Sequence, residues 1–328
     1  MTTLSQKPLG IIDTLGEGFA AINRHLWILI LPVLLDLLFA FGPGVSVAPL
    51  TQRATAAVEQ AMTEGLPADD ASEVQGRVAD TARQYGDANL LGILAWQLPS
   101  LVNATSPVGL PKLTGPLLAE LDSSVVTLGY GLGLGLLGLA GASFYLAGLA
   151  SAVRRELGRA GLVARSGQVW LRLATLVGLV VVLSIPATML SVLVMVICGS
   201  LSPALVSFFG SLLLAGAMLL GFYAYFLSDA IALVGLWPVP ALLASAQVVG
   251  RHFWASLGFI LLVTVINTGI PLAWRVITGN PAGLVVAIVG HAYISSGLAA
   301  AAMFFFWQRL QLILAAGGGA PLTRREAQ

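Results

Sequence analysis

Long runs of apolar residues dominate the chain, and they recur too often for a water-soluble fold. Six runs reach or approach the roughly 20 residues that a helix needs to cross a hydrocarbon core. The predicted spans are Leu26–Gly42, Val125–Val153, Leu173–Cys198, Ala204–Leu227, Ser256–Trp274 and Leu284–Trp307. Because a backbone in lipid must satisfy its own hydrogen bonds, this pattern predicts an all-α integral membrane protein with about six transmembrane helices, arranged as three helical hairpins.

The polar intervals divide the chain into five parts. Residues 1–25 form an amphipathic N-terminal segment, and 26–42 form the first span. We expect 43–122 to be a helical insertion on the outer side of the membrane. Residues 123–308 hold the second to sixth spans with cytoplasmic interfacial helices, and 309–328 form a C-terminal tail.

Inside the insertion, small apolar residues recur at helical spacing in two stretches. These stretches, Thr51–Gly65 and Asp70–Gly86, are predicted to be short amphipathic helices. Leu90–Val102 is more apolar but too short to span a bilayer. We expect it to lie flat in the membrane interface, anchored by Trp96.

The composition supports a lipid environment. Of the 328 residues, 57% are hydrophobic and only 9% are charged, whereas soluble domains carry about 25% charged residues. The single cysteine, Cys198, excludes an intrachain disulfide and a two-cysteine redox or zinc motif. The chain has no basic stripe with interleaved aromatic residues, so nucleic acid is not expected as a partner.

The distribution of Lys and Arg predicts how the chain threads through the membrane. With the N-terminus in the cytoplasm, eleven of the sixteen basic residues fall on the cytoplasmic side. The outer insertion carries four basic and nine acidic residues, and long outer segments translocate largely regardless of charge. We therefore expect both termini to be cytoplasmic.

A short basic and aromatic motif recurs before the outward-going spans. The recurring residues are Arg24, His25, Trp27, Trp170, Arg251, His252 and Trp254. Two interpretations remain open. The residues are independent interface anchors, or they mark three copies of one hairpin introduced by a cytoplasmic interfacial helix.

This layout resembles a broad group of uncharacterised bacterial multi-pass membrane proteins. The group includes the non-catalytic membrane domain attached to some glycerophosphodiester phosphodiesterases. The likeness is strongest over Gly16–Leu35 and Leu227–Leu262. It implies a protein of the bacterial cytoplasmic (inner) membrane without intrinsic chemistry, and it assigns a role to no single residue.

Three polar residues lie at similar depths within the predicted spans, namely Asp36, Asn267 and His291. A charged group in hydrocarbon costs at least about 2.5 kcal/mol, so such residues are candidate functional groups. We expect one polar layer in which Asp36 accepts a hydrogen bond from His291. The layer is either a structural latch between the first and last hairpins, a proton or ion relay, or a ligand position for a pigment or haem.

The second span is rich in glycine. Gly131, Gly135 and Gly138 are predicted to form a face against which another helix packs closely. A groove for a lipid or pigment tail is the alternative. The stretch Gly133–Gly138 also matches the dinucleotide-binding pattern, but its context is a membrane helix and not a strand that leads into one.

The sequence contains none of the common catalytic motifs for nucleophilic, zinc or nucleotide chemistry. We therefore expect a non-enzymatic scaffold or accessory subunit of a membrane assembly, or a lipid-associated module, whose partners are membrane lipids and other membrane subunits. The alternative is a transporter or channel that uses the layer of Asp36, Asn267 and His291 together with helices broken at Pro186 and Pro271.

Overall fold

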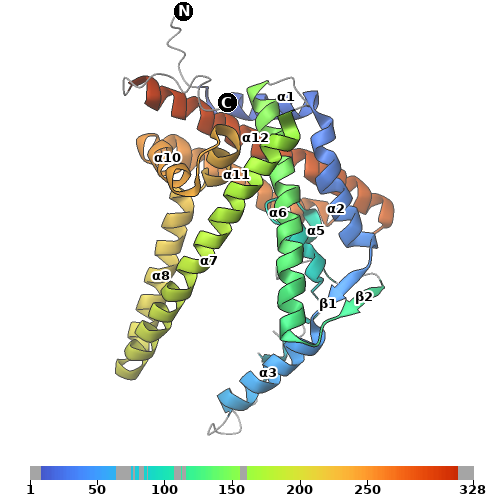
Figure 1. Ribbon diagram of the computed structural model, residues 1–328, viewed down its shortest axis with the longest axis vertical. Helices are drawn as coiled ribbons and strands as arrows, with labels where there is room; N and C mark the ends of the chain where they lie inside the picture. The colour runs from blue at the N-terminus through green and yellow to red at the C-terminus, as the bar shows by residue number, and fades with distance from the viewer. Residues whose placement is uncertain are drawn as a thin grey trace, which may run out of the picture. The chain divides into compact units, whose positions relative to one another are not determined.

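The chain is almost entirely helical in a computed structural model (Figure 1). The structure describes residues 9–63, 75–76, 78–80, 85–86, 88–106, 112, 116–155 and 161–316. Its helices, in chain order, are α1 (Ile11–Arg24), η1 (Leu26–Leu29), α2 (Ile30–Phe41), α3 (Ala48–Thr63), η2 (Leu90–Ala95), α5 (Leu101–Ala104), α6 (Ser124–Arg154), α7 (Leu162–Leu201), α8 (Pro203–Tyr223), α9 (Leu227–Asp229), η4 (Ala230–Val234), α10 (Pro238–Arg251), α11 (Phe253–Trp274) and α12 (Pro281–Ala316).

Five of these helices are long and apolar enough to cross a membrane. They are α6, α8 with its continuation to Val234, α7, α11 and α12. The bent pair of α1 and α2 brings the count to six if the pair forms one span. The helical class and the long apolar segments therefore agree with the sequence, and they are what a multi-pass membrane protein requires.

Four helices, α6, α7, α11 and α12, are longer than the predicted spans. Helix α7 has 40 residues, about 60 Å at the usual helical rise, and it includes the stretch around Trp170 that was expected to be a separate interfacial helix. It also runs through Pro186, and α11 continues through Pro271. Among the described residues, neither helix is broken at its proline, contrary to what the transporter or channel alternative assumed.

The insertion contains two strands that the sequence analysis did not predict. Strand β1 (Gly44–Ser46) pairs in parallel with β2 (Leu117–Glu120), so the two ends of the insertion lie side by side (Figure 1). Strands of three and four residues are too short to show an alternating pattern. The first predicted insertion helix is present as α3, whereas most of the second, over 70–86, lies outside the described residues.

The chain divides into two compact units. Unit 1 comprises Met1–Arg24, Leu146–Val263 and Gly297–Gln328, and unit 2 comprises His25–Tyr145 and Thr264–Ser296. Helices α6, α11 and α12 each contribute one part to each unit.

An aromatic cluster forms the centre of unit 1. The ring of Phe305 on α12 stacks on Phe259 of α11 at a centroid distance of 4.5 Å and on Phe226 at 5.4 Å. Phe306 stacks on Phe226 from the same helix. All four side chains are fully buried, so these rings join α11, α12 and the segment after α8.

Helix α1 crosses α12 at glycine, which allows the two backbones to approach closely. A Cβ atom on Gly18 would lie 2.6 Å from the backbone of Gly297 and of Ala301. On α12, Gly297 leaves room for the ring of Phe19. The sequence analysis missed this contact, because the glycine lies in the polar segment before the first span.

Unit 2 has its own apolar core at the opposite half of α12. Leu101, Ala287 and Ile288 are buried there, and Leu37 and Trp274 pack against them. The Trp274 ring lies over Gly290, whose missing side chain provides the space.

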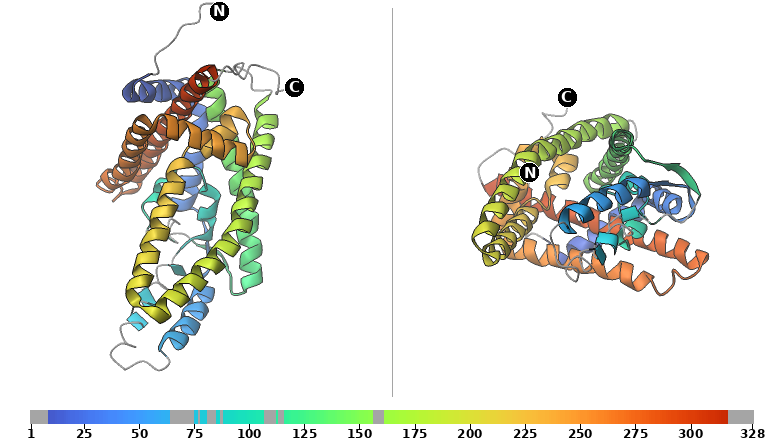
Figure 2. Two further views of the ribbon diagram at one scale, coloured as in Figure 1. Left: turned by 90° about the vertical axis from the view of Figure 1, so that its left-hand side faces the viewer. Right: turned by 90° about the horizontal axis from the view of Figure 1, so that it is seen from below.

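Helices α7 and α8 form a hairpin whose two members lie side by side in both Figures 1 and 2. Ser202 caps α8 by accepting a hydrogen bond from Ala204 N, and Pro203 occupies the first turn, where a missing N–H is harmless. No charged residue occurs between Arg172 and Asp229. The hairpin therefore carries no charged residue from Leu173 to the end of α8.

Candidate functional site

The carboxylate of Asp36 is the most deeply buried acidic group among the described residues of unit 2. Its side chain on α2 has no exposed surface, and both oxygens accept hydrogen bonds. The hydroxyl of Ser100 donates to Oδ1, and the amide of Leu101 donates to Oδ2 at 2.7 Å. A buried carboxylate is tolerated when its oxygens have donors, so these two partners explain how Asp36 is accommodated inside an apolar helix.

The donors come from the segment that the sequence analysis placed flat in the membrane interface. Ser100 also accepts from Asn103 N at 3.2 Å, which begins the short helix α5. Leu101, the next residue, is buried in the core of unit 2. The stretch 90–104 is therefore folded against α2, although Trp96 is 41% exposed, as expected for an anchor.

Asn89 holds the start of this segment in place. Its side-chain oxygen accepts from Val45 N at 3.0 Å and from Leu91 N at 3.1 Å. The first bond ties the segment to β1, and the second caps η2. The carboxamide thereby fixes both the strand pair and the turn that leads toward Ser100.

The expected hydrogen bond between Asp36 and His291 is not formed. The Nε2 atom of His291 faces the hydroxyl of Ser295 at 3.4 Å, and Nδ1 has no partner among the described residues. The Ser295 hydroxyl donates to Asn267 Oδ1 at 3.2 Å. The three predicted residues thus fall into two groups, because the segment around Ser100 supplies the donors that Asp36 requires.

The three residues of the group on α11 and α12 are progressively more buried. Asn267 is exposed, Ser295 is half-buried, and His291 is 4% exposed. Because the Ser295 hydrogen points to Asn267, the contact with His291 requires the ring hydrogen on Nε2. His291 Nδ1 is then an acceptor without a donor.

The predicted glycine face on α6 packs closely against another described segment at one of its three glycines. A Cβ atom on Gly138 would lie 2.8 Å from the carbonyl oxygen of Ile93 in η2. Gly131 and Gly135 have no atom of the described chain within 4 Å of such a position. Close contact therefore occurs at Gly138 alone of the three, and it is made with the insertion and not with a long helix.

The repeated motif has a common backbone geometry at two of its three occurrences. His25 follows the 14-residue helix α1, and His252 follows the 14-residue helix α10. Their φ and ψ angles are −137° and 50° for His25, and −121° and 41° for His252. The third occurrence has no such break, because Trp170 lies inside α7.

The aromatic residues of the motif lie in different surroundings. Trp27 contacts Phe144 edge-on at a centroid distance of 6.0 Å, whereas Trp254 is 80% exposed. Arg24 and Arg251 are exposed at the ends of their helices. These environments suit residues at a membrane surface, and their anchoring role stays a prediction.

Two arginines of α7 support the turn after α9. The segment Ala230–Val234 is a single π-helical turn that ends at Gly235, where φ is +78°. Arg165 donates to the carbonyls of Ala232 and Leu233 at 3.3 Å, and the Arg172 guanidinium lies beside Gly235. Positive side chains at a helix C-terminus satisfy its free carbonyls, so these contacts hold the turn in place.

Among the described residues, no group of three or more His, Cys, Asp or Glu side chains is placed to hold a metal ion. Comparisons with protein-family models, with curated proteins and with solved structures each find no match to this chain.

Proposed function

We propose that this chain is a non-enzymatic scaffold or accessory subunit of a membrane assembly, and that the hairpin of α7 and α8 is the surface that contacts another membrane protein. One observation carries the proposal. In the membrane-length windows of α7 and α8, none of the residues is buried inside the chain. The corresponding share is 67% for α6 and 50% for α12.

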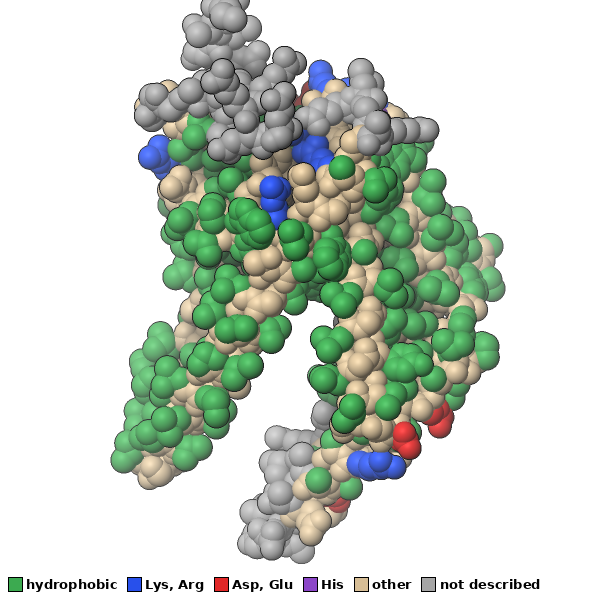
Figure 3. Space-filling model, viewed as in Figure 1, with side chains coloured by type: hydrophobic (Ala, Val, Ile, Leu, Met, Phe, Trp, Pro, Cys, Tyr) green, Lys and Arg blue, Asp and Glu red, His purple; other side chains and the backbone are tan. Residues whose placement is uncertain are grey.

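The surface of the hairpin is almost entirely hydrophobic on the face seen in Figure 3. Branched aliphatic residues such as Val182, Leu190 and Leu193 are more than half exposed. Such a surface is unfavourable in water and favourable in lipid or against apolar helices. The proposal therefore requires that the hairpin lies inside the bilayer.

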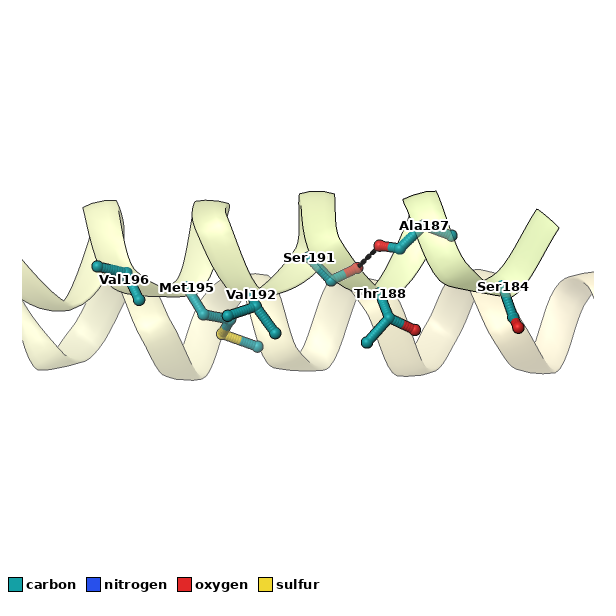
Figure 4. A pocket seen from close by; sticks show the side chains of 7 residues that line it. All are labelled: Ser184, Ala187, Thr188, Ser191, Val192, Met195 and Val196. Atoms are coloured by element: carbon teal, nitrogen blue, oxygen red, sulfur yellow. Dashed lines mark hydrogen bonds between the residues drawn. The ribbon is translucent and has the colours of Figure 1, made fainter. Parts of the chain in front are cut away.

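One face of α7 carries small side chains over two successive turns. Ser184, Ala187, Thr188 and Ser191 recur at helical spacing and line a shallow groove of about 600 Å³ (Figure 4). Ser191 donates to the carbonyl of Ala187 at 2.8 Å, so its hydroxyl is satisfied within the helix. Small residues with satisfied hydroxyls let a second helix approach closely in a membrane.

Photo-crosslinking in native membranes tests this function. A photoreactive residue replaces Thr188 in the groove or, as a matched control, Leu190, which is 63% exposed on the opposite face of the same helix. We expect a discrete protein adduct from position 188 and lipid adducts from position 190. Lipid adducts alone from both positions would show that the hairpin contacts no subunit.

A transporter or channel is the second candidate, and the burial of His291 beside Ser295 and Asn267 favours it. Polar groups inside spans often mark a substrate or ion path. Against this function, Asp36 is fully hydrogen-bonded by Ser100 and Leu101 and shares no described hydrogen bond with the other group. In an accessory subunit, the hydrogen bonds to Asp36 would serve only to hold the insertion against α2.

A further inference from the structure

The positive charge of Arg309 is buried without an acidic partner. The side chain, on α12 in unit 1, is 4% exposed. Its guanidinium carbon lies 3.3 Å from the centroid of the Phe305 ring, and Nη1 donates to the Phe305 carbonyl at 3.4 Å. Among the described residues, no carboxylate forms an ion pair with it. A buried charge is costly unless it is paired, so this arrangement points to a missing anion.

The aromatic cluster links Phe305, which Arg309 covers, to α11. Phe305 stacks on Phe259, and Ser256 lies almost one turn before Phe259 on α11. The hydroxyl of Ser256 is completely buried, and no described residue forms a hydrogen bond with it. A neutral donor without a partner therefore accompanies the unpaired cation.

Two further basic groups lie at the junction of α10 and α11. His252 is half-buried between the two helices, directly after the exposed Arg251. Burial lowers the pKa of His252, and the positive charges of Arg309 and then Arg251 lower it further. The junction thus has a positive potential that the surrounding described residues do not neutralise.

The buried acid of this unit does not pair with Arg309. Asp229, three residues after Phe226, is 9% exposed and forms no ion pair with any described Lys or Arg. The one ion pair among the described residues of unit 1 joins Arg155 to Glu17 at the surface, at 3.3 Å. The anion that would neutralise Arg309 is therefore not supplied by these acidic residues.

We infer that Arg309, Arg251, His252 and Ser256 form a phosphate-binding site at the junction of α10, α11 and the end of α12. Guanidinium groups bind phosphate oxygens with two parallel hydrogen bonds, and a hydroxyl supplies a further donor. The ligand is either the headgroup phosphate of an anionic phospholipid or a free phosphate. The inference goes beyond the proposed subunit role and does not depend on it.

Lipid binding to the purified full chain tests the headgroup source. After delipidation, native mass spectrometry measures retention of dioleoylphosphatidylglycerol and, in parallel, of dioleoylphosphatidylcholine. We expect Arg309→Gln and Arg251→Gln to weaken phosphatidylglycerol binding by at least about fivefold, because each removes a charge-assisted contact. Arg155→Gln makes the same change in net charge outside the site and is expected to bind as the wild type does.

The second arm tests free phosphate. The ring-proton resonances of His252 are followed by NMR during titration with sodium phosphate, against sodium chloride at equal ionic strength. A phosphate-specific shift that Arg309→Gln abolishes, without selective phosphatidylglycerol binding, would identify free phosphate as the ligand. Selective phosphatidylglycerol binding would identify the lipid headgroup.

The inference is overturned if both arginine variants retain phosphatidylglycerol as the wild type does and phosphate shifts no His252 resonance. Equal binding of phosphatidylcholine and phosphatidylglycerol, again without a phosphate-specific shift, would also overturn it. Arg251 is exposed and has no described side-chain partner, so Arg251→Gln keeps the test valid if Arg309→Gln fails to fold. Arg309→Lys, which keeps the charge, is expected to retain part of the binding.

Discussion

The hydroxyl of Ser100 donates a hydrogen bond to the carboxylate of Asp36, although the two residues are 64 positions apart. Together with the amide of Leu101, this bond attaches the segment 90–104 to α2. The contact turns a predicted interfacial segment into part of the core of unit 2. It also gives Asp36 a structural role that requires no partner from the last span.

Replacing Asp36 by Ala is expected to lower the free energy of unfolding by about 1–3 kcal/mol, because the donors of Ser100 and Leu101 lose their acceptor. Ser100→Ala should cost less, since Leu101 still donates to the carboxylate. Thermal unfolding in detergent, with limited proteolysis of the segment 90–104, measures both effects. Ser184→Ala is the control, because that exposed hydroxyl bonds only to Val181 of its own helix. Equal stability of all three variants would refute the structural role of the hydrogen bonds from Ser100 and Leu101 to Asp36.

The sequence predicts that Asp36 needs a partner, but it does not predict which one. His291 was the natural choice because it lies at a similar depth in another span. Ser100 belongs to a stretch whose composition resembles an interfacial segment, and hydroxyls are common at such places. Only the folding of 90–104 against α2, fixed by Asn89 and the strand pair, brings this serine to the carboxylate.

Gly18→Ala is expected to destabilise unit 1 by about 1–3 kcal/mol, because the added Cβ would meet the α12 backbone at 2.6 Å. Gly16→Ala is a matched control on the same helix, where the added carbon meets no described atom within 4 Å. The control should be neutral or slightly stabilising, since alanine favours helix. Thermal unfolding of the two variants measures the difference. If Gly16→Ala lost as much stability as Gly18→Ala, the crossing of α1 and α12 would be wrong.

The helices were predictable because long apolar runs have few alternatives to helix in lipid. Their close contacts were less predictable. Gly131, Gly135 and Gly138 recur at helical spacing, yet among the described residues only Gly138 has a close neighbour, which is η2. The sequence identifies glycines at which another segment could pack closely. Whether a segment packs there depends on the fold of the rest of the chain.

His252 should make stability depend on pH. Its pKa is lowered in the folded protein, so the unfolded chain binds the proton more readily. The contribution of neutral His252 is therefore fully present above the unfolded value near 6.5 and is lost as the pH falls below it. Wild type should lose more stability than His252→Gln between about pH 7 and pH 5.

The cause of the His252 shift is testable in the same experiment. Arg309→Gln removes one of the two positive charges that face the ring, so the pKa of His252 should rise in this variant. An NMR titration of the His252 ring protons measures the change. A pKa that is the same in wild type and Arg309→Gln would contradict the positive potential at this junction.

Flux through liposomes distinguishes the subunit from the transporter. Wild type, Asp36→Asn and His291→Ala are reconstituted, and proton flux and uptake of small ions are measured. A subunit without its own pathway is expected to give flux at the level of empty liposomes in all three cases. Flux in wild type that either substitution abolishes would instead favour the alternative function.

The most direct test of the central claim is the membrane topology of the α7–α8 hairpin. Ser202, between the two helices, is replaced by cysteine in a Cys198→Ser background, and fusion reporters are attached to both termini. We predict that a membrane-impermeant maleimide labels position 202 from outside intact cells, while both reporters give a cytoplasmic signal. Termini in opposite compartments, or labelling of position 202 only after permeabilisation, would contradict the account.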